Sequence, residues 1–346
     1  MKESIFLEVG GVVVLDWLLE LLFGILKFFL HPVLYISLFL AAYLGVSRVK
    51  RERKNFSVRA ENAYFELKQL FPIGLIIGLV ISVISIAVGL VIPFAAIILI
   101  GALTILASLI GRVRLLSPAY AVGLTFFILI FIGGKSLPIP LFQDAFKQLE
   151  GTVFPSVAVL LGLFIIGEGF LIYYNGKKGT SPMLITSKRG YKVGIHEAKR
   201  LWLVPVFLVI PGSAVTIPFD WWPVFSIGDN MFSLLLVPFA VGFHEKIKGM
   251  LPKEAVETQG KRVIALGVVI LALSIGSYWV PVLSIIAAGL AILGREVLTI
   301  IRYWTEENLP FYFSKRKNGL MILGILPESP ASKMGLSIGE VIIKVN

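Results

Sequence analysis

The chain has 346 residues, of which 57% are hydrophobic and only 15% are charged. This composition excludes an ordinary soluble globular protein and indicates that most helices face lipid or one another. The absence of cysteine excludes disulfides, iron–sulfur clusters and cysteine-ligated zinc. The net charge of +11 could indicate a nucleic-acid partner, but the placement of the charges, described below, argues against one.

Residues 1–47 are predicted to hold an amphipathic or spanning N-terminal helix and a short second span, Pro32–Val46. Val9–Leu30 is apolar enough to insert, yet it carries Asp16, Glu20 and Lys27 near one face. This helix either crosses the bilayer or lies in its interface. Residues 48–72 follow as a basic cytoplasmic loop with a helical pattern.

Residues 73–294 are predicted to form a polytopic transmembrane domain, because long apolar runs alternate there with short polar loops. The predicted spans are Ile73–Ile92, Phe94–Gly111, Pro118–Gly133, Thr152–Tyr174, Leu201–Ile217, Met231–Phe243, Val263–Ile275 and Val282–Gly294. Residues 295–308 then form a linker helix to the tail, 309–346. The expected fold class is therefore mostly α, a helical membrane protein with 8–10 transmembrane helices and a partial β-rich C-terminal module.

Basic residues determine the expected topology. If the loop 48–72 is cytoplasmic, strict alternation of the spans places 28 of the 32 Lys and Arg residues on the same side. This distribution follows the positive-inside rule, so both termini are expected in the cytoplasm. Anionic lipid of the inner leaflet is the expected partner of these cations, and nucleic acid is not. The candidate lipid- or partner-facing residues are Arg48, Lys50, Arg51, Arg53, Lys54, Lys188 and Arg189.

The sequence offers no convincing catalytic constellation. His196-Glu197 and His244-Glu245 each begin the zinc-protease motif, but position i+4 is Arg200 in the first case and Lys248 in the second. There is no nucleophile elbow or phosphate-binding loop. We therefore expect a protein without catalytic activity, metal or cofactor.

Glu168 is the clearest ionisable residue within a predicted span outside the first helix. A secondary transporter would need several such residues along a pathway. The simpler interpretation is that Glu168 reaches the inner interface or pairs with a basic residue.

The tail reads as water-soluble β structure. Leu320–Leu326 resembles a strand, Ala331–Met334 a helical turn capped by Gly335, and Val341–Ile343 a second strand. With its Ser-Pro-Ala, Gly-Leu and Gly-acid-Val-Ile pattern, the tail resembles the first half of a bacterial PDZ domain. The resemblance implies peptide binding by strand addition, and it places the carboxylate loop and pairing strand at Asn318, Gly319, Leu320, Met321 and Leu323. Because the sequence ends at Asn346, we expect the module to be partial.

The whole layout resembles the MinJ family of bacterial division topology proteins. FFLHPVLY at Phe28–Tyr35, VKRERKNF at Val49–Phe56 and RLLSPAY at Arg114–Tyr120 are similar to segments of that family. The resemblance implies a non-enzymatic adaptor at the septum and poles that links a DivIVA-type scaffold to the division inhibitor MinD.

Two other functions stay open at this point. A PDZ-bearing regulator of a membrane protease or transporter would have the same layout. A secondary transporter would show uptake that depends on Glu168.

Overall fold

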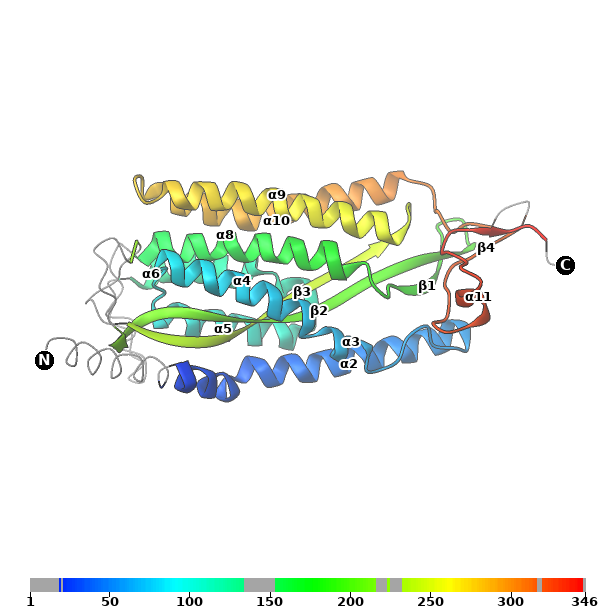
Figure 1. Ribbon diagram of the computed structural model, residues 1–346. Helices are drawn as coiled ribbons and strands as arrows, with labels where there is room; N and C mark the ends of the chain where they lie inside the picture. Colours follow the sequence, from blue (N-terminus) through cyan, green and yellow to red (C-terminus); the bar gives the residue numbers. More distant parts are fainter. Residues whose placement is uncertain are drawn as a thin grey trace, which may run out of the picture.

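The computed structural model describes residue 19 and residues 21–133, 153–215, 223–224, 232–315 and 319–344. The chain is elongated, and its helices lie along a long β-hairpin (Figure 1). The first described helix is Leu21–Leu30. The helices that follow are α2 (Pro32–Phe56), α3 (Phe65–Gln69), α4 (Pro72–Val88), α5 (Phe94–Ile110), the short 3-10 helix η1 (Val113–Leu116), α6 (Pro118–Ile132), α8 (Val153–Leu171), the π-helical turn η3 (Ile172–Gly176), α9 (Pro252–Gly276), α10 (Val282–Asn308) and α11 (Pro330–Lys333). The strands are β1 (Ser181–Thr186), β2 (Lys192–Val215), β3 (Phe232–Ile247), β4 (Leu320–Met321) and β5 (Val341–Ile342).

The centre of the molecule is the antiparallel hairpin β2–β3, with β1 added at its polar end. The two helices predicted at Leu201–Ile217 and Met231–Phe243 are therefore wrong, because both segments are strands over their described residues. The apolar part of β2 is long enough to cross a hydrocarbon layer of about 30 Å at about 3.3 Å per residue. A hairpin that crosses and returns would count as two helices do, so the expected alternation of sides stays a prediction.

Because both faces of the hairpin are buried, its sequence pattern resembles that of a buried helix. Trp202, Val204 and Val206 lie in the main core, where Phe164 of α8 contacts Phe239 at a ring-centroid distance of 4.4 Å. Leu203, on the opposite face, lies in a second core with residues of α2. A strand buried on both faces has a continuous apolar run, which periodicity cannot distinguish from a buried helix.

Prolines stand where the hairpin tolerates them. Pro205 lies directly opposite Pro238. In an antiparallel ladder, only a non-hydrogen-bonded pair directs both backbone nitrogens outward, so this pairing removes no bond between the strands. In a transmembrane helix the same prolines would each have freed a carbonyl.

Helix α4 and Leu70, which lies just before it, cover the outer edge of β2. The N–H of Leu203 donates to the carbonyl of Leu70 (2.9 Å), and the N–H of Phe207 donates to Ser82 Oγ (2.8 Å). Between them, Pro205 has no N–H to satisfy. Each outward donor of this stretch is therefore paired or absent, as an apolar environment requires.

Two glycines allow α4 to approach this edge closely. A Cβ at Gly74 would lie 2.0 Å from the carbonyl oxygen of Leu203, and a Cβ at Gly78 would lie 2.1 Å from that of Pro205. These glycines and Ser82 follow each other at four-residue intervals and so share one helix face. Such a row of small residues is common where membrane helices pack together, and here it allows a helix to pack closely against a strand.

The edge of β3 is covered by other elements. A Cβ at Gly24, in the helix Leu21–Leu30, would lie 2.7 Å from the carbonyl oxygen of Leu234. A Cβ at Gly242 of β3 would lie 2.1 Å from the carbonyl oxygen of Val113 in η1. Both edges of the hairpin are thus in contact with protein at these points.

Of the 8–10 transmembrane helices expected, the described residues bear out five by length and composition. Five described helices are long and apolar enough to span: Pro32–Phe56, Phe65–Val88, Phe154–Gly176, Pro252–Gly276 and Val282–Asn308. Three more are apolar but shorter: Leu21–Leu30, Phe94–Ile110 and Pro118–Ile132. Two of the predicted spans correspond to the strands β2 and β3 instead.

Several predicted boundaries also move. The helix predicted to end at Val46 continues through Arg48 to Phe56, inside the predicted basic loop. The predicted linker helix Arg295–Asn308 is the second half of α10. These helices exceed the hydrocarbon thickness, so their charged ends extend beyond the apolar region.

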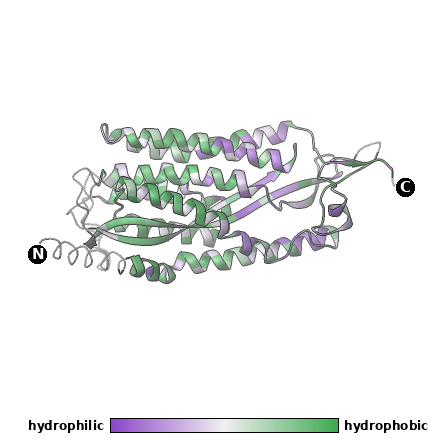
Figure 2. Cartoon of the chain, viewed as in Figure 1, coloured by the Kyte–Doolittle hydropathy of each residue, from purple (hydrophilic) through white to green (hydrophobic). Residues whose placement is uncertain are grey.

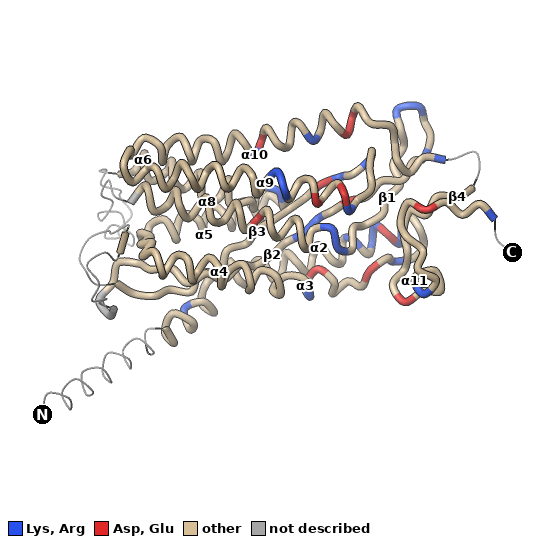
Figure 3. Tube along the Cα trace, turned by 45° about the horizontal axis from the view of Figure 1, so that its top comes forward, with Lys and Arg blue, Asp and Glu red and all other residues tan. Residues whose placement is uncertain are grey.

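Polar and charged residues gather at one end of the molecule. Figure 2 shows apolar residues along one half of the helices and polar residues at the end nearest the C-terminus. In Figure 3, Lys and Arg concentrate at this same end, around the end of α2, β1 and the tail. The charge segregation inferred from the loops is therefore present in three dimensions.

The tail has the local structure expected in part. β4 pairs with β5 through Leu320–Ile342 and Met321–Val341, so the regular part of the first strand is shorter than predicted. Gly335, at φ +73°, ends α11. The N–H of Leu336 bonds to the carbonyl of Ala331 (3.2 Å), and that of Gly335 to Ser332 (3.1 Å), which is a Schellman cap.

Gly78→Ala is expected to lower the free energy of unfolding by about 1–3 kcal/mol, because its methyl group would overlap the Pro205 carbonyl and separate α4 from β2. Thermal unfolding of the detergent-solubilised protein measures the change. Gly101→Ala is the matched control, since its Cβ meets nothing closer than 3.5 Å. Equal melting temperatures for the two variants would contradict this account of the edge.

Candidate functional site

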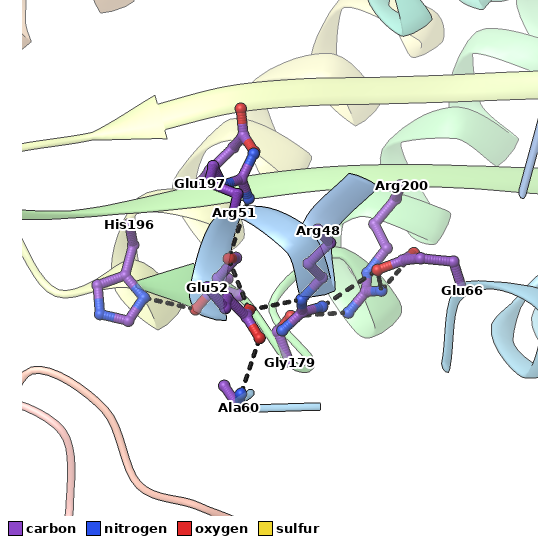
Figure 4. Close-up of polar contacts among 11 residues, drawn as sticks. Arg48, Arg51, Glu52, Ala60, Glu66, Gly179, His196, Glu197 and Arg200 are labelled. Carbon is purple, nitrogen blue, oxygen red and sulfur yellow. Dashed lines mark hydrogen bonds and ion pairs between the residues drawn. The ribbon is translucent and has the colours of Figure 1, made fainter. Parts of the chain in front are cut away.

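A buried group of charged side chains lies where the apolar hairpin meets the polar end of the molecule (Figure 4). It joins α2, α3, β1, β2 and β3. We call it the junction cluster, and its members are Arg48, Arg51, Glu52, Glu66, Ser181, His196, Glu197, Arg200 and His244.

Glu66 of α3 is the centre of one half of the cluster. Both its carboxylate oxygens accept from Arg200 Nη1 at 2.7 Å, and Oε1 also accepts from Arg48 Nη1 at 3.1 Å. The two guanidinium groups also lie on the ring of Phe65, at 4.6 Å for Arg200 and 5.5 Å for Arg48. All three charged side chains are buried, so the desolvation cost of each charge is offset by its opposite charges in the group.

Glu52 connects this half to β1. It accepts from Arg48 Nε (2.9 Å), from Ser181 Oγ (2.7 Å) and from the backbone N–H of Ala60 (2.7 Å). Glu52 lies one helical turn after Arg48 on α2, which puts both on the inward face. The chain after α2 is thereby tied back to its own helix.

Glu197 connects the other half to β3. Its carboxylate pairs with Arg51 and accepts from His244 Nε2 (2.9 Å). Burial alone would raise the pKa of Glu197, but the bond to His244 and the charge of Arg51 outweigh it and lower the pKa to about 2.

His196 points to the opposite side of β2, towards the tail. Its Nε2 lies 2.8 Å from the carbonyl oxygen of Leu323, and its Nδ1 lies 2.9 Å from Thr180 Oγ1. A carbonyl can only accept, so Nε2 carries the proton and Nδ1 accepts from the hydroxyl. Burial lowers the pKa of His196 to about 4, and the nearby charge of Arg48 acts in the same direction.

A small cavity of about 30 Å³ lies inside the cluster, between Arg48, Arg51 and Lys199. It has room for about one water molecule. The unpaired Arg48 Nη2 and Arg51 Nε are buried donors of the kind such a water satisfies. The arrangement is suited to fixing elements to one another.

The predicted basic residues separate into two groups. Arg48 is buried and Arg51 is partly buried, and both carry ion pairs of the junction cluster. The others are exposed at the polar end: Lys50, Arg53, Lys54, Lys188 and Arg189. The helical repeat explains the division on α2, because residues 48 and 52 face the hairpin while 50, 53 and 54 face away.

The predicted peptide-binding residues lie beside the junction cluster. Asn318 is outside the described residues. Gly319 has φ +108° and leads into β4, which contains Leu320 and Met321. Leu323 follows and contacts β2 through His196.

The sequence analysis missed the acidic members of the cluster. Arg48 and Glu52 at i, i+4, inside a segment interpreted as a loop, were the available signal. The incomplete zinc motifs at His196 and His244 lie on strands, where neighbouring side chains point to opposite faces. Among the described residues, no three His, Asp or Glu side chains form a metal-binding group.

Glu168 is buried and paired. It accepts from Arg295 Nη2 of α10 (2.9 Å) and from Ser117 Oγ (2.8 Å). This contact matches the simpler interpretation of Glu168, with the basic partner on a helix instead of a loop.

Glu66→Ala is expected to lower the free energy of unfolding by about 3–5 kcal/mol, because it leaves Arg48 and Arg200 buried without their anion. Chemical or thermal unfolding in detergent measures the loss. Lys188→Ala is the control: Lys188 also contacts a glutamate, but its side chain is 93% exposed. A Glu66→Ala protein as stable as the control would show that the cluster is not a structural lock.

Acid is expected to remove the stability contributed by His196 and Glu197 in two overlapping steps. Burial raises the pKa of Glu245 to about 7, so this carboxyl stabilises the fold as the pH falls from about 7 to 4.5 and partly offsets the first step. The folded pKa of His196, about 4, lies below its usual 6.5, so the unfolded chain binds the proton first and stability falls between about pH 6.5 and 4. The folded pKa of Glu197, about 2, lies below its usual 4.5, so a second loss extends from about pH 4.5 towards 2. Melting temperatures measured against pH test this, and His196→Gln should remove only the upper step.

No family model matches the chain, and no solved structure is similar to it. A curated relative, the "Cell division topological determinant MinJ" of Bacillus subtilis (strain 168), is 40% identical over 332 residues, which cover 96% of this chain and 83% of the relative. A "Probable cell division topological determinant MinJ" of Lacticaseibacillus paracasei is 23% identical over 330 residues, covering 91% of this chain and 81% of the relative. With such identity to the Bacillus protein along nearly its whole length, the chain belongs to the MinJ family of cell division topological determinants.

Proposed function

We propose that this chain is a non-enzymatic membrane adaptor in bacterial division-site selection. In this role it links a DivIVA-type polar and septal scaffold to a MinD-like ATPase. The observation that carries the proposal is the 40% identity to a division topological determinant over 96% of the chain. The named partners come from the family resemblance.

The arrangement of charges supports an adaptor. Buried ionisable side chains such as Glu66, Glu168 and Arg200 are used in ion pairs between elements. The exposed cations and the tail share one end of the molecule (Figure 3). A docking protein needs such a rigid platform with accessible groups on one side.

We place this polar end in the cytoplasm, with both termini on that side. The cations Lys50, Arg53 and Lys54 extend from α2 just beyond its apolar half. Cations in this position are attracted to anionic lipid of the inner leaflet, at about 1 kcal/mol each. The tail, which we interpret as a PDZ-like module, then faces cytoplasmic partners.

A fluorescent fusion of the full chain is expected to concentrate at septa and poles of dividing cells, and a chain ending before Leu309 is expected to lose part of this pattern. Deletion of the gene should displace septa towards the poles. Live-cell microscopy with measured septum positions tests both outcomes. An evenly distributed fusion together with normal septa after deletion would refute the division role.

Charge reversal of Lys50, Arg53 and Lys54 to Glu is expected to weaken binding to vesicles containing anionic lipid, while leaving the fold intact because all three side chains are exposed. Flotation of purified protein in nanodiscs with labelled vesicles measures binding. The control exchanges the same residues for the other basic type (Lys50→Arg, Arg53→Lys, Lys54→Arg). If both triple variants bind equally, the cations do not recognise lipid charge.

A further inference from the structure

One edge of the strand after Gly319 is paired within the tail, and the other edge faces away from that pairing. The N–H of Ile322 donates to the carbonyl of Glu340 (2.8 Å), and its carbonyl accepts from the N–H of Gly339 (2.9 Å). Backbone groups of successive residues in a strand alternate between the two edges. Those of Met321 and Leu323 therefore point to the outer edge, where an added strand would pair.

The polar end of β2 already holds this outer edge. His196 Nε2 of β2 donates to the carbonyl of Leu323 at 2.8 Å. Thr180 fixes the ring from its other nitrogen, and Phe313 lies against the ring at a centroid distance of 5.1 Å. His196 is completely buried at this contact. The acceptor that an added strand would use is thus already bonded within the chain.

The tail is anchored separately from this edge. The N–H of Tyr312 donates to the carbonyl of Lys248 (2.9 Å), and the carbonyl of Phe313 accepts from the N–H of Gly194 (3.1 Å). These bonds lie between α10 and β4, on the connecting segment. The edge contact can therefore open while the tail stays attached to the hairpin.

An apolar cavity of about 220 Å³ lies beside the same edge. One wall is the segment Leu323–Leu326, and the opposite wall is formed by Phe56 and Val58 at the end of α2. An apolar cavity of about 150 Å³ is enough to take up a benzene ring. The space next to the strand edge thus suits one large apolar side chain.

We propose that His196 is an intramolecular competitor that holds the Met321–Leu323 edge closed, and that an extended peptide with a large apolar side chain displaces it. The backbone of the peptide takes over the Leu323 carbonyl, and its apolar side chain enters the cavity between the tail and the end of α2. The inference rests on the proposed role of the tail as a peptide-binding module. Peptide binding is thereby coupled to release of the Leu323 edge from His196, while the connecting segment stays bonded to the hairpin.

The first test measures hydrogen exchange in the purified full chain in detergent. His196→Ala is expected to speed exchange of the amides of residues 319–326 about tenfold, the scale of one net hydrogen bond, while exchange in β2 and β3 beyond the junction stays unchanged. His196→Gln retains a neutral donor and should exchange more like the natural protein. Thr180→Val removes only the orienting hydroxyl and should give an intermediate rate, which keeps the test valid if His196→Ala fails to fold. Unchanged exchange in both His196→Ala and Thr180→Val would overturn the proposal that His196 holds the Met321–Leu323 edge closed.

The second test uses a phage-displayed library of random ten-residue peptides, selected on the His196→Ala protein. Synthetic copies of the selected peptides are then titrated into the natural protein and the His196→Ala and His196→Gln variants by fluorescence anisotropy. We expect about tenfold tighter binding to His196→Ala than to the natural protein, an enrichment of large apolar residues, and weaker binding when Val58→Trp fills the cavity. Equal affinities, or a library that yields no binder, would overturn the proposal.

The two proposals fail differently. Septal localisation that depends on the tail, together with equal peptide affinities, would leave the adaptor role intact and remove the His196 mechanism. Peptide binding controlled by His196 in a protein that does not localise to septa would do the opposite.

Discussion

The need to satisfy the backbone of an apolar strand governs the rest of this structure. An open β-hairpin in a hydrocarbon environment is untenable unless protein covers both its edges, where the unpaired backbone groups lie. Leu70, just before α4, and Ser82 of α4 accept from the N–H groups of Leu203 and Phe207 on the β2 edge, and Gly74 and Gly78 of α4 pack against its carbonyls. Helices α2, α4, α5 and α8 therefore cover the hairpin, while α10 packs on other helices (Figure 1).

The junction cluster joins the polar end of the hairpin to the helices that surround it. Where β2 leaves the apolar region, its Arg200 and Glu197 take partners from α3 and α2, so the hairpin and its surrounding helices are fixed at the same level. A second set of contacts fixes α10, whose Glu306 accepts from the backbone N–H groups of Lys248 and Gly249 at 2.6 and 2.9 Å. Together these ion pairs and hydrogen bonds give the polar end a fixed geometry, although each ion pair gains little net stability against its desolvation cost.

This fixed end is relevant to a topological determinant of cell division. Exposed cations on α2 and on the β1–β2 turn lie at the same end of the molecule as the tail, and the buried cluster fixes the elements that carry them. His196 gives this end a direct connection between the hairpin and the tail. A partner that binds the tail would thus act against a rigid support.

The sequence by itself determined the membrane class, the segregation of charge to one end, the family and the Schellman turn of the tail. These depend on composition, on local spacing or on residues such as Gly335, which act within a few positions. Only the tertiary structure decided that Leu201–Ile217 and Met231–Phe243 hold strands, since burial on both faces removes the alternation that marks a strand. Their prolines and the shortness of the second segment, which suits a strand better than a spanning helix, were the available warnings. The tertiary structure also decided that Arg48 is buried while Lys50 is exposed, and that Glu66 pairs with Arg200. Pairing across distant segments follows from packing and not from local pattern.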